Sequence, residues 1–139
     1  MFSVIFPGQG SQIVGMCKEF YTKYDLAKKL FKEADDNLKF SISEIILNGP
    51  KEKLDLTENT QPAIFLVGYT IFKVLKNEHS IDLNKAKFFA GHSLGEYTAI
   101  ACANGLNFSE TLKILQIRGR AMQSAVPQGE GTMIAVLGK

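Results

Sequence analysis

The sequence predicts an α/β fold in which helices flank a short parallel sheet. Three short apolar runs, at residues 3–6, 87–90 and 132–137, have the composition of strands, and long stretches of helical periodicity separate them. Strands that alternate with helices pair in parallel, because each crossover returns the chain to the same end of the sheet. The 139 residues, 45% of them hydrophobic, are enough for one domain with a buried core.

The first third of the chain predicts one strand followed by helices. Residues 3–6 are apolar and β-favouring, and Pro7-Gly8 ends the run. A helix over 12–24 is expected from four side chains at helical spacing, which are Ile13, Met16, Phe20 and Tyr24. A second helix begins at Asp25, a favourable N-cap, and residues 42–47 make one or two turns before a break.

A long buried helix is expected in the middle of the chain. Thr60 would cap it, and Pro62 in its first turn suits a position that needs no backbone N–H. The interior, AIFLVGYTIFKVL, is apolar nearly all round, so this helix should lie within the core.

Two more helices are expected after the strand at 87–90. Residues 94–103 are helical, and Gly105 lies just past their end, where a left-handed cap is common. The last helix runs from about Ser109, its cap, to Ala125, and a stretch rich in glycine follows.

Composition excludes several classes of protein. The net charge of +2 is too small to indicate nucleic acid, and no apolar run reaches the roughly 18 residues of a membrane helix. The N-terminus lacks the basic and long apolar regions of a signal peptide. Cys17 and Cys102 have neither metal-like nor redox-like spacing, so we expect core packing, no metal and a cytoplasmic protein.

The segment FFAGHSLGEYTAIA, at residues 88–101, carries the pattern Gly-x-Ser-x-Gly between an apolar strand and a helix. This pattern predicts a nucleophile elbow, in which Ser93 occupies a strained turn. Gly91 and Gly95 fit that turn, because close packing leaves no room there for a β-carbon. The helix beginning at Leu94 would direct free N–H groups at the reacting centre, so the Leu94 N–H is an expected oxyanion donor.

Neither histidine is well placed as the general base for Ser93. His92 is the neighbour of Ser93 in sequence, so its side chain leaves the turn in another direction, and we expect it to be structural or pocket-lining. His79 stands at the polar end of a helix and is expected on the surface. The base that the elbow requires would therefore come from elsewhere.

The loop FPGQGSQ, at residues 6–12, follows the first expected strand. It fails the dinucleotide-binding pattern G-x-G-x-x-G, because Ile13 stands where the third glycine belongs. Gly8 and Gly10 make the loop flexible enough to bring a backbone N–H close to a reacting atom. Gln9, between them, is where a second oxyanion donor would be expected.

Arg118 is expected to project from a buried helical stripe. Its neighbours at three and four residues are all apolar: Ile114, Leu115, Ala121 and Met122. A buried guanidinium needs an anion or several acceptors, and a substrate carboxylate held by two hydrogen bonds would serve. An internal ion pair is the alternative for Arg118, whereas Arg120 is expected on the surface.

Four motifs together resemble the malonyl-CoA:acyl carrier protein transacylases and the related acyltransferase domains of fatty-acid and polyketide synthases. They are FPGQGSQ, TQPA at 60–63, GHSLGEY at 91–97 and RGRAMQ at 118–123, in family order along the whole chain. The resemblance implies an acyl-carrier-protein S-malonyltransferase of fatty-acid biosynthesis that needs no cofactor beyond its substrate, malonyl-CoA.

The resemblance also implies roles for the residues singled out above. Ser93 would take the malonyl group from malonyl-CoA while the backbone N–H groups of Gln9 and Leu94 hold the oxyanion, and Arg118 would bind the malonyl carboxylate. The phosphopantetheine thiol of acyl carrier protein would then accept the group, which is ping-pong covalent catalysis. Leu94 itself weakly favours malonyl over branched acyl groups.

Family members are about twice as long, with a large α/β-hydrolase-like subdomain and a small ferredoxin-like one. By this resemblance, residues 1–126 match the first part of the large subdomain, and 127–139 match a linker and the first strand of the small one. The family's catalytic histidine falls in the remaining half. We therefore expect this chain to be poorly active alone and to need that half as a partner.

Two other functions stay open. An α/β-hydrolase-type esterase or thioesterase could use the same elbow, although Arg118 argues against it because a simple ester has no carboxylate to hold. A truncated, non-catalytic product that only binds carrier protein would also fit the lack of a base.

Overall fold

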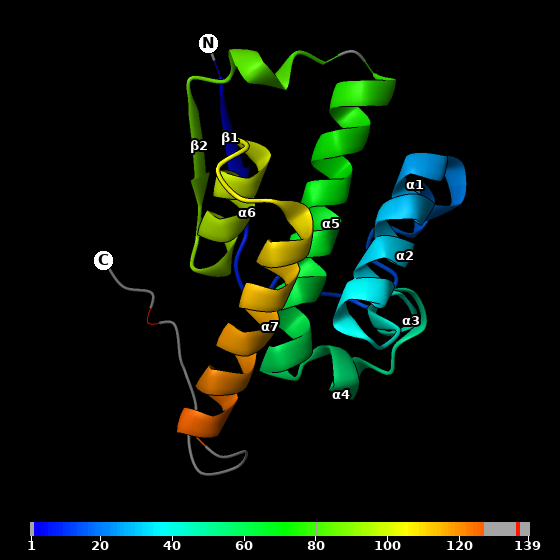
Figure 1. Ribbon diagram of the computed structural model, residues 1–139, viewed down its shortest axis with the longest axis vertical. Coiled ribbons are helices and arrows are strands. Elements are labelled where there is room, and N and C mark those ends of the chain that lie inside the picture. The colour runs from blue at the N-terminus through cyan, green and yellow to red at the C-terminus, as the bar shows by residue number, and fades with distance from the viewer. Residues whose placement is uncertain (1, 80, 127–135, 137–139) are drawn as a thin grey trace.

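The structure is a computed structural model that describes residues 2–79, 81–126 and 136 (Figure 1). Its elements in chain order are β1 (Ser3–Phe6), α1 (Lys18–Lys23), α2 (Asp25–Leu38), α3 (Ile42–Asn48), α4 (Lys51–Leu54), α5 (Thr57–Glu78), η1 (Leu83–Lys85), β2 (Phe88–Gly91), α6 (Leu94–Cys102) and α7 (Phe108–Ala125). The strand expected at 132–137 lies outside the described residues, apart from an exposed Val136, and so does the linker at 127–131.

The described sheet consists of β1 and β2, which pair in parallel from Ser3 opposite Phe88 to Phe6 opposite Gly91. Figure 1 shows α6 against this sheet, α5 in the centre of the molecule with α7 along it, and α1 to α4 on the far side of α5. The predicted α/β fold with a short parallel sheet and flanking helices is thereby confirmed for the described residues.

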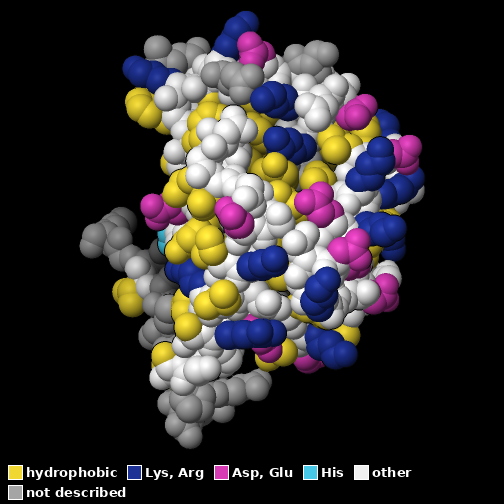
Figure 2. All heavy atoms as spheres, in the orientation of Figure 1, with side chains coloured by type: hydrophobic (Ala, Val, Ile, Leu, Met, Phe, Trp, Pro, Cys, Tyr) yellow, Lys and Arg dark blue, Asp and Glu magenta, His cyan; other side chains and the backbone are white. Residues whose placement is uncertain are grey.

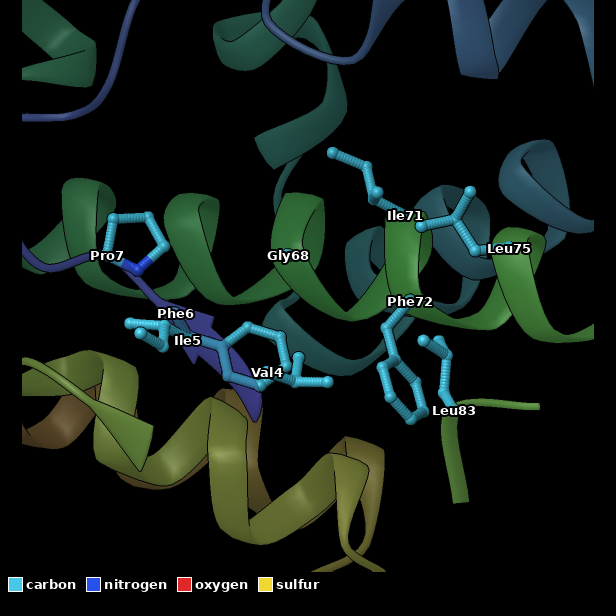
Figure 3. A pocket seen from close by; sticks show the side chains of 9 residues that line it. All are labelled: Val4, Ile5, Phe6, Pro7, Gly68, Ile71, Phe72, Leu75 and Leu83. Atoms are coloured by element: carbon cyan, nitrogen blue, oxygen red, sulfur yellow. The ribbon is translucent and has the colours of Figure 1, made fainter. Parts of the chain in front are cut away.

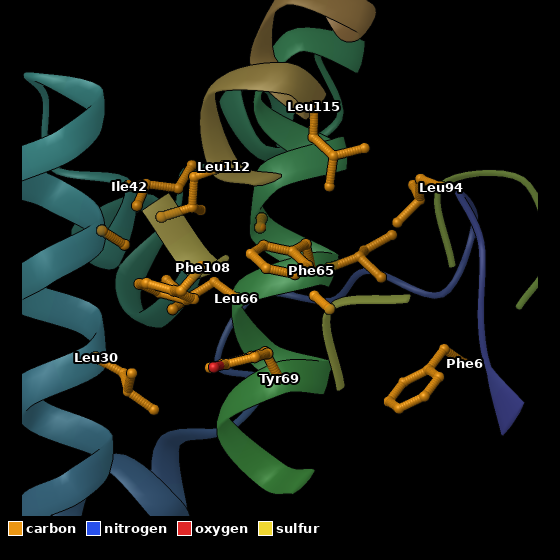
Figure 4. Close-up of a cluster of buried hydrophobic side chains, with 14 of the residues drawn as sticks. Phe6, Leu30, Ile42, Phe65, Leu66, Tyr69, Leu94, Phe108, Leu112 and Leu115 are labelled. Atoms are coloured by element: carbon orange, nitrogen blue, oxygen red, sulfur yellow. The ribbon is translucent and has the colours of Figure 1, made fainter. Parts of the chain in front are cut away.

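The core is built around α5, as its nearly continuous apolar sequence predicts. Residues 63–66 of this helix are at most 4% exposed. Figure 4 shows Phe65 and Tyr69 of α5 packed with Phe108 of α7, and the three ring centroids lie 4.9–5.6 Å apart. Each large apolar side chain buried in this way contributes about 1.5–3 kcal/mol to folding. The aromatic cluster therefore fixes α7 against α5, and with it the residues that α7 carries.

The first helix is shorter than its spacing predicts. It begins at Lys18, because Gly15 and Cys17 adopt left-handed conformations with φ of 87° and 65°, which a helix does not tolerate. Ile13 consequently lies outside the helix and is 67% exposed. The apolar stripe alone predicted a helix from residue 12, but residues before Lys18 form a turn instead. A tertiary contact holds this turn, because the Gly15 N–H donates to the Ile46 carbonyl at 2.7 Å.

Two other helix starts differ from the expected caps. The long helix begins at Thr57 with Leu56 as its N-cap, so Thr60 and Pro62 lie in the second turn. The Thr60 hydroxyl donates to the Leu54 carbonyl at 2.6 Å, which ties the helix to α4 rather than capping it. In α2, Asp25 is the first helical residue and Tyr24 is the cap.

The C-terminus of α6 and the N-terminus of α7 are capped by residues other than the expected Gly105 and Ser109. Asn104, with φ of 66°, is the left-handed residue after α6, and the Gly105 N–H donates to the Ile100 carbonyl at 2.8 Å. A β-carbon on Gly105 would lie 2.7 Å from Ile100 Cγ2, so the glycine serves close packing. Asn107, not Ser109, caps α7, since its Oδ1 accepts the Glu110 N–H at 2.8 Å.

The surface carries charges of both signs. Figure 2 shows lysine and arginine side chains interspersed with aspartate and glutamate on the viewed face. Among the described helices, none combines the length and the apolar character that crossing a bilayer requires.

Candidate active site

Ser93 lies in the turn between β2 and α6, where it is the N-cap of the helix. Its φ of 54° and ψ of −114° are dihedrals that a residue with a β-carbon rarely adopts. The turn is held by two backbone bonds, from the Gly95 N–H to the His92 carbonyl at 2.9 Å and from the Glu96 N–H to the Ser93 carbonyl at 3.1 Å. Ser93 is exposed. The strained, accessible turn predicted from Gly-x-Ser-x-Gly is present.

The two glycines of the motif are required by close packing, as predicted. A β-carbon on Gly91 would lie 1.9 Å from the Gly95 carbonyl carbon, so the two glycine backbones touch across the turn. A β-carbon on Gly95 would lie 2.5 Å from the Phe6 carbonyl oxygen and 2.7 Å from that of Pro7. The elbow is thus pressed against the end of β1, from which the glycine loop departs.

The glycine loop lies directly against the elbow. A β-carbon on Gly8 would lie 2.5 Å from Nδ1 of His92 and 2.8 Å from its carbonyl oxygen. The His92 N–H donates to the Phe6 carbonyl at 3.1 Å, and the exposed imidazole packs against Gly8. His79 is exposed, as predicted, and its Nε2 lies 2.7 Å from the Tyr24 hydroxyl oxygen.

The two expected oxyanion donors come from elements that meet at the elbow. Leu94 is the first residue of α6, so its backbone N–H has no partner within the helix and lies at the positive end of the helix dipole. Its side chain is 1% exposed and anchors that end in the core. Gln9 is in the glycine loop, and its side-chain Nε2 donates to Thr57 Oγ1 at 3.3 Å.

Arg118 of α7 reaches Ser93 from across the fold. Its Nη2 donates to Ser93 Oγ at 3.1 Å, and its Nη1 donates to Gln61 Oε1 at 2.7 Å. The guanidinium carbon lies 5.8 Å from the centroid of the Tyr97 ring, which is within range of a cation–π contact. Both hydrogen-bond acceptors described for Arg118 are neutral, so the described residues give no support to the internal ion pair. Arg120 is exposed and pairs with Glu58 at 3.0 Å, as its predicted surface position implies.

The predicted apolar surroundings of Arg118 are only partly correct. Leu115 is fully buried and Met122 half-buried, but Ile114 is 37% exposed and Ala121 is exposed. Arg118 is therefore half-buried at the margin of the core rather than within it. A guanidinium at this margin can hold an incoming ligand without full desolvation.

Gly119 explains how Arg118 comes close enough, and the sequence reasoning missed it. A β-carbon on Gly119 would lie 2.6 Å from the Thr57 carbonyl oxygen and 2.7 Å from Glu58 Cα. The glycine therefore lets the backbones of α5 and α7 touch. The signal was present in the RGRAMQ motif, since a glycine inside a helix costs about 1 kcal/mol and needs a packing reason.

Gln61 is a second residue that the sequence reasoning did not assign. It is fully buried, accepts from Arg118 through Oε1, and its Nε2 donates to Met122 Sδ at 3.2 Å. A buried amide is costly without partners, so a glutamine inside the apolar run after Thr60 was the available signal. Gln61 fixes one edge of the guanidinium and leaves the other edge directed at Ser93.

The two cysteines lie outside this constellation. Cys102 is 3% exposed and packs in the core as expected, and Cys17 is half-buried in the turn before α1. Burial raises the pKa of both thiols to about 12, so neither forms a reactive thiolate near neutral pH.

Comparisons with known proteins identify the family. The family profile described as "Acyl transferase domain" matches residues 3–138. The chain is 42% identical over 137 residues to the malonyl CoA-acyl carrier protein transacylase of Haemophilus influenzae, and the match covers 99% of this chain and 43% of that protein. It therefore spans less than half the length of that relative.

Solved structures give the same result. The acyl carrier protein S-malonyltransferase of Vibrio cholerae matches with a TM-score of 0.86 and 38% identity, over 92% of this chain and 41% of that structure. A malonyl-transacylase solved in complex with a type II polyketide synthase acyl carrier protein matches with a TM-score of 0.85 and 37% identity, over 92% of this chain and 40% of that one.

Proposed function

The chain belongs to the acyl transferase domain family, and from this premise we propose that it forms the nucleophile-bearing part of a malonyl-CoA:acyl carrier protein transacylase. The observation that carries the proposal is the hydrogen bond from the Arg118 guanidinium to Ser93 Oγ at 3.1 Å. A strained serine beside a directed cation suits an acyl donor that has a carboxylate close to its reacting carbonyl. The names of the relatives indicate malonyl-CoA and acyl carrier protein as the two substrates.

In the first half-reaction Ser93 Oγ bonds to the thioester carbon of malonyl-CoA and gives its proton to a base. The carbonyl oxygen becomes an oxyanion, which the backbone N–H groups of Leu94 and Gln9 stabilise. When the carbonyl re-forms, the bond to sulfur breaks, coenzyme A leaves with a proton, and malonyl-serine remains. In the second half-reaction the phosphopantetheine thiol attacks the ester carbon, loses its proton to the base, and Ser93 leaves as the free hydroxyl.

Arg118 selects the acyl group in this proposal. Its Nη1 donates to Gln61, and its Nη2, which donates to Ser93 in the free protein, is directed at the nucleophile and can bind an incoming carboxylate. One methylene separates the carboxylate from the reacting carbonyl of a malonyl group. A group that short keeps the carboxylate at the arginine while the carbonyl reaches Ser93.

The general base comes from outside the described residues. His92 packs against Gly8, and His79 is engaged with Tyr24 on the surface. The chain spans 43% of the length of the Haemophilus relative, so the additional polypeptide of such relatives is the proposed source of the base.

The same polypeptide would cover the bare side of the sheet. Ile5 and Phe88, which lie on one face of β1 and β2, are 75% and 60% exposed, whereas parallel sheets are normally covered on both faces. Beside β1 lies an apolar cavity of about 230 Å³ between the strand and α5 (Figure 3). Its lining residues are Val4, Ile5, Phe6, Pro7, Gly68, Ile71, Phe72, Leu75 and Leu83.

The test is acylation of Ser93. Mass spectrometry of the intact protein detects the added malonyl group, and peptide mapping locates it. The chain would be incubated with malonyl-CoA and holo acyl carrier protein, alone and after co-expression with the unmatched part of the Vibrio relative. We expect transfer only in the co-expressed complex, and none with Ser93→Ala. Rapid transfer by the chain alone would contradict the proposal that the base comes from the additional polypeptide. Absence of a Ser93 adduct in the complex would contradict the proposed transacylase function. Ile5→Lys should prevent complex formation, whereas Ile114→Lys, on α7, should not.

A further inference from the structure

Hydrogen bonds within the glycine loop fix only part of its conformation, since the Ser11 hydroxyl donates to the Gly8 carbonyl at 2.9 Å. Gln9, Gly10 and Ser11 are exposed, and Gly10 has φ of 104°. Glycine populates such angles readily but also leaves them readily. A backbone N–H stabilises an oxyanion only if it is held in place before the reaction. A contact between the loop and the rest of the fold is therefore needed to keep the Gln9 peptide beside the elbow.

Gln12 supplies one connection. Its side-chain Oε1 accepts the Gly10 N–H at 2.8 Å, and its Nε2 donates to Asp55 Oδ1 at 3.0 Å. Gln12 is half-buried, unlike the three residues before it. The contact requires a side chain that accepts on one atom and donates on another, which an amide does and a carboxylate or an amine does not.

Asp55 is itself a fixed point. It is the C-cap of α4, its N–H donates to the Lys51 carbonyl at 2.9 Å, and its Oδ2 pairs with the Lys51 ammonium. It stands two residues before Thr57, where α5 begins and where the Gln9 side chain is also bound. The loop is thus tied to the start of the helix that carries Gln61.

We propose that Gln12 and Asp55 are positioning residues, whose bridge holds the glycine loop so that the Gln9 N–H faces the reacting oxygen. The inference rests on the proposed transacylase function, and neither residue touches substrate. The bridge acts on the rate of the acylation step rather than on the binding of the acyl donor.

Exchanging donor and acceptor tests the bridge. Gln12→Glu keeps an acceptor for the Gly10 N–H but sets two carboxylates against each other. The double variant Gln12→Glu with Asp55→Asn restores a donor, because the Asn amide can donate to the new carboxylate. Asp55→Asn also breaks the ion pair with Lys51. Asp25→Asn is the matched control for that loss, because it breaks a surface ion pair with Lys28 at 2.9 Å.

The first readout does not depend on the proposed function. It is the rate at which the Gly10 amide hydrogen exchanges with solvent, which NMR measures in the folded chain. We expect Gln12→Glu to accelerate it about fivefold, the size of a typical hydrogen bond, and the double variant to restore it. Equal exchange in the wild type, Gln12→Glu and the double variant would overturn the bridge. Unchanged circular dichroism establishes that each variant folds.

The second readout is the reaction of Ser93 with malonyl-CoA in the complex co-expressed with the unmatched part of the Vibrio relative, which supplies the base. We expect the rate constant at saturation to fall in Gln12→Glu by up to about a hundredfold, the cost of losing one oxyanion donor. The rate constant should recover in the double variant, and the half-saturating concentration should stay unchanged. If the Gly10 exchange rate changes in Gln12→Glu but the acylation rate constant does not, the bridge only stabilises the loop and the positioning role is wrong. If the wild type itself shows no Ser93 adduct, the proposed function fails together with the positioning role, whereas the exchange result still reports on the bridge.

Discussion

The Arg118 guanidinium donates a 3.1 Å hydrogen bond to the hydroxyl oxygen of Ser93, a residue 25 positions earlier in the chain. Under the proposed function, an incoming malonyl carboxylate would replace the serine as the acceptor on Nη2. Gln61 accepts from the other terminal nitrogen at 2.7 Å, which fixes the orientation of the guanidinium in the free protein.

Replacing Arg118 by lysine should remove most of the preference for malonyl-CoA over acetyl-CoA. An ammonium is a point charge and cannot bind Gln61 and a carboxylate in the same planar geometry. Loss of one charge-assisted hydrogen bond corresponds to about a tenfold to hundredfold fall in the ratio of Ser93 acylation rates. Arg120→Lys, at an exposed arginine two residues along the same helix, should leave the ratio unchanged. An undiminished malonyl preference in Arg118→Lys would argue for a different carboxylate site.

Gln61→Ala should destabilise the protein and lower the affinity for malonyl-CoA. The change leaves Nη1 of the half-buried guanidinium without its acceptor and opens a void beside α5, which should lower the free energy of unfolding by about 1–3 kcal/mol. Urea denaturation measures this. Gln61→Glu should behave differently, since its carboxylate would pair with Arg118 and compete with substrate. A raised half-saturating malonyl-CoA concentration, together with retained stability, is the expected result for Gln61→Glu.

Alanine at Gly91 or Gly95 should unfold the elbow. The added β-carbon would lie 1.9 Å from a backbone carbon in the first case and 2.5 Å from a backbone oxygen in the second, and neither neighbour can turn aside. We expect losses above about 3 kcal/mol in thermal or urea unfolding. Gly68→Ala is the control, because its β-carbon would make an ordinary 3.4 Å contact with Thr98 Cγ2. Gly68 is inside α5, so that change should be neutral or stabilising.

The buried thiol of Cys102 should make the fold sensitive to alkaline pH. Burial raises its pKa from 9.0 to about 12, so between these values the unfolded chain loses a proton that the native state keeps. This thiol should therefore lower the free energy of unfolding as pH rises above 9, by up to about 1.4 kcal/mol per pH unit, and Cys17, whose pKa is raised in the same way, adds to the fall. Cys102→Ala should show a shallower fall than the wild type over the same range. Parallel curves would mean that the thiol titrates normally in the folded protein.

The elements were predictable where a local signal sets them. The strand at Ser3–Phe6, the buried character of α5 and the turn at Ser93 follow from residue types within a few positions of each other. Helix starts were less predictable. Thr60 has the residue type of a cap, yet α5 begins at Thr57, because the Thr60 hydroxyl is used by the Leu54 carbonyl of α4.

The sequence by itself determined the elbow turn, since the strained φ of Ser93 and the need for Gly91, whose β-carbon would meet the Gly95 backbone, arise from sterics within five residues. Only the tertiary structure decided what faces that serine. Arg118 reaches it because Gly119 lets α7 touch α5, and Gln61 aims the guanidinium from 57 residues away. Contacts between distant segments depend on how helices pack, which no local pattern of residues specifies.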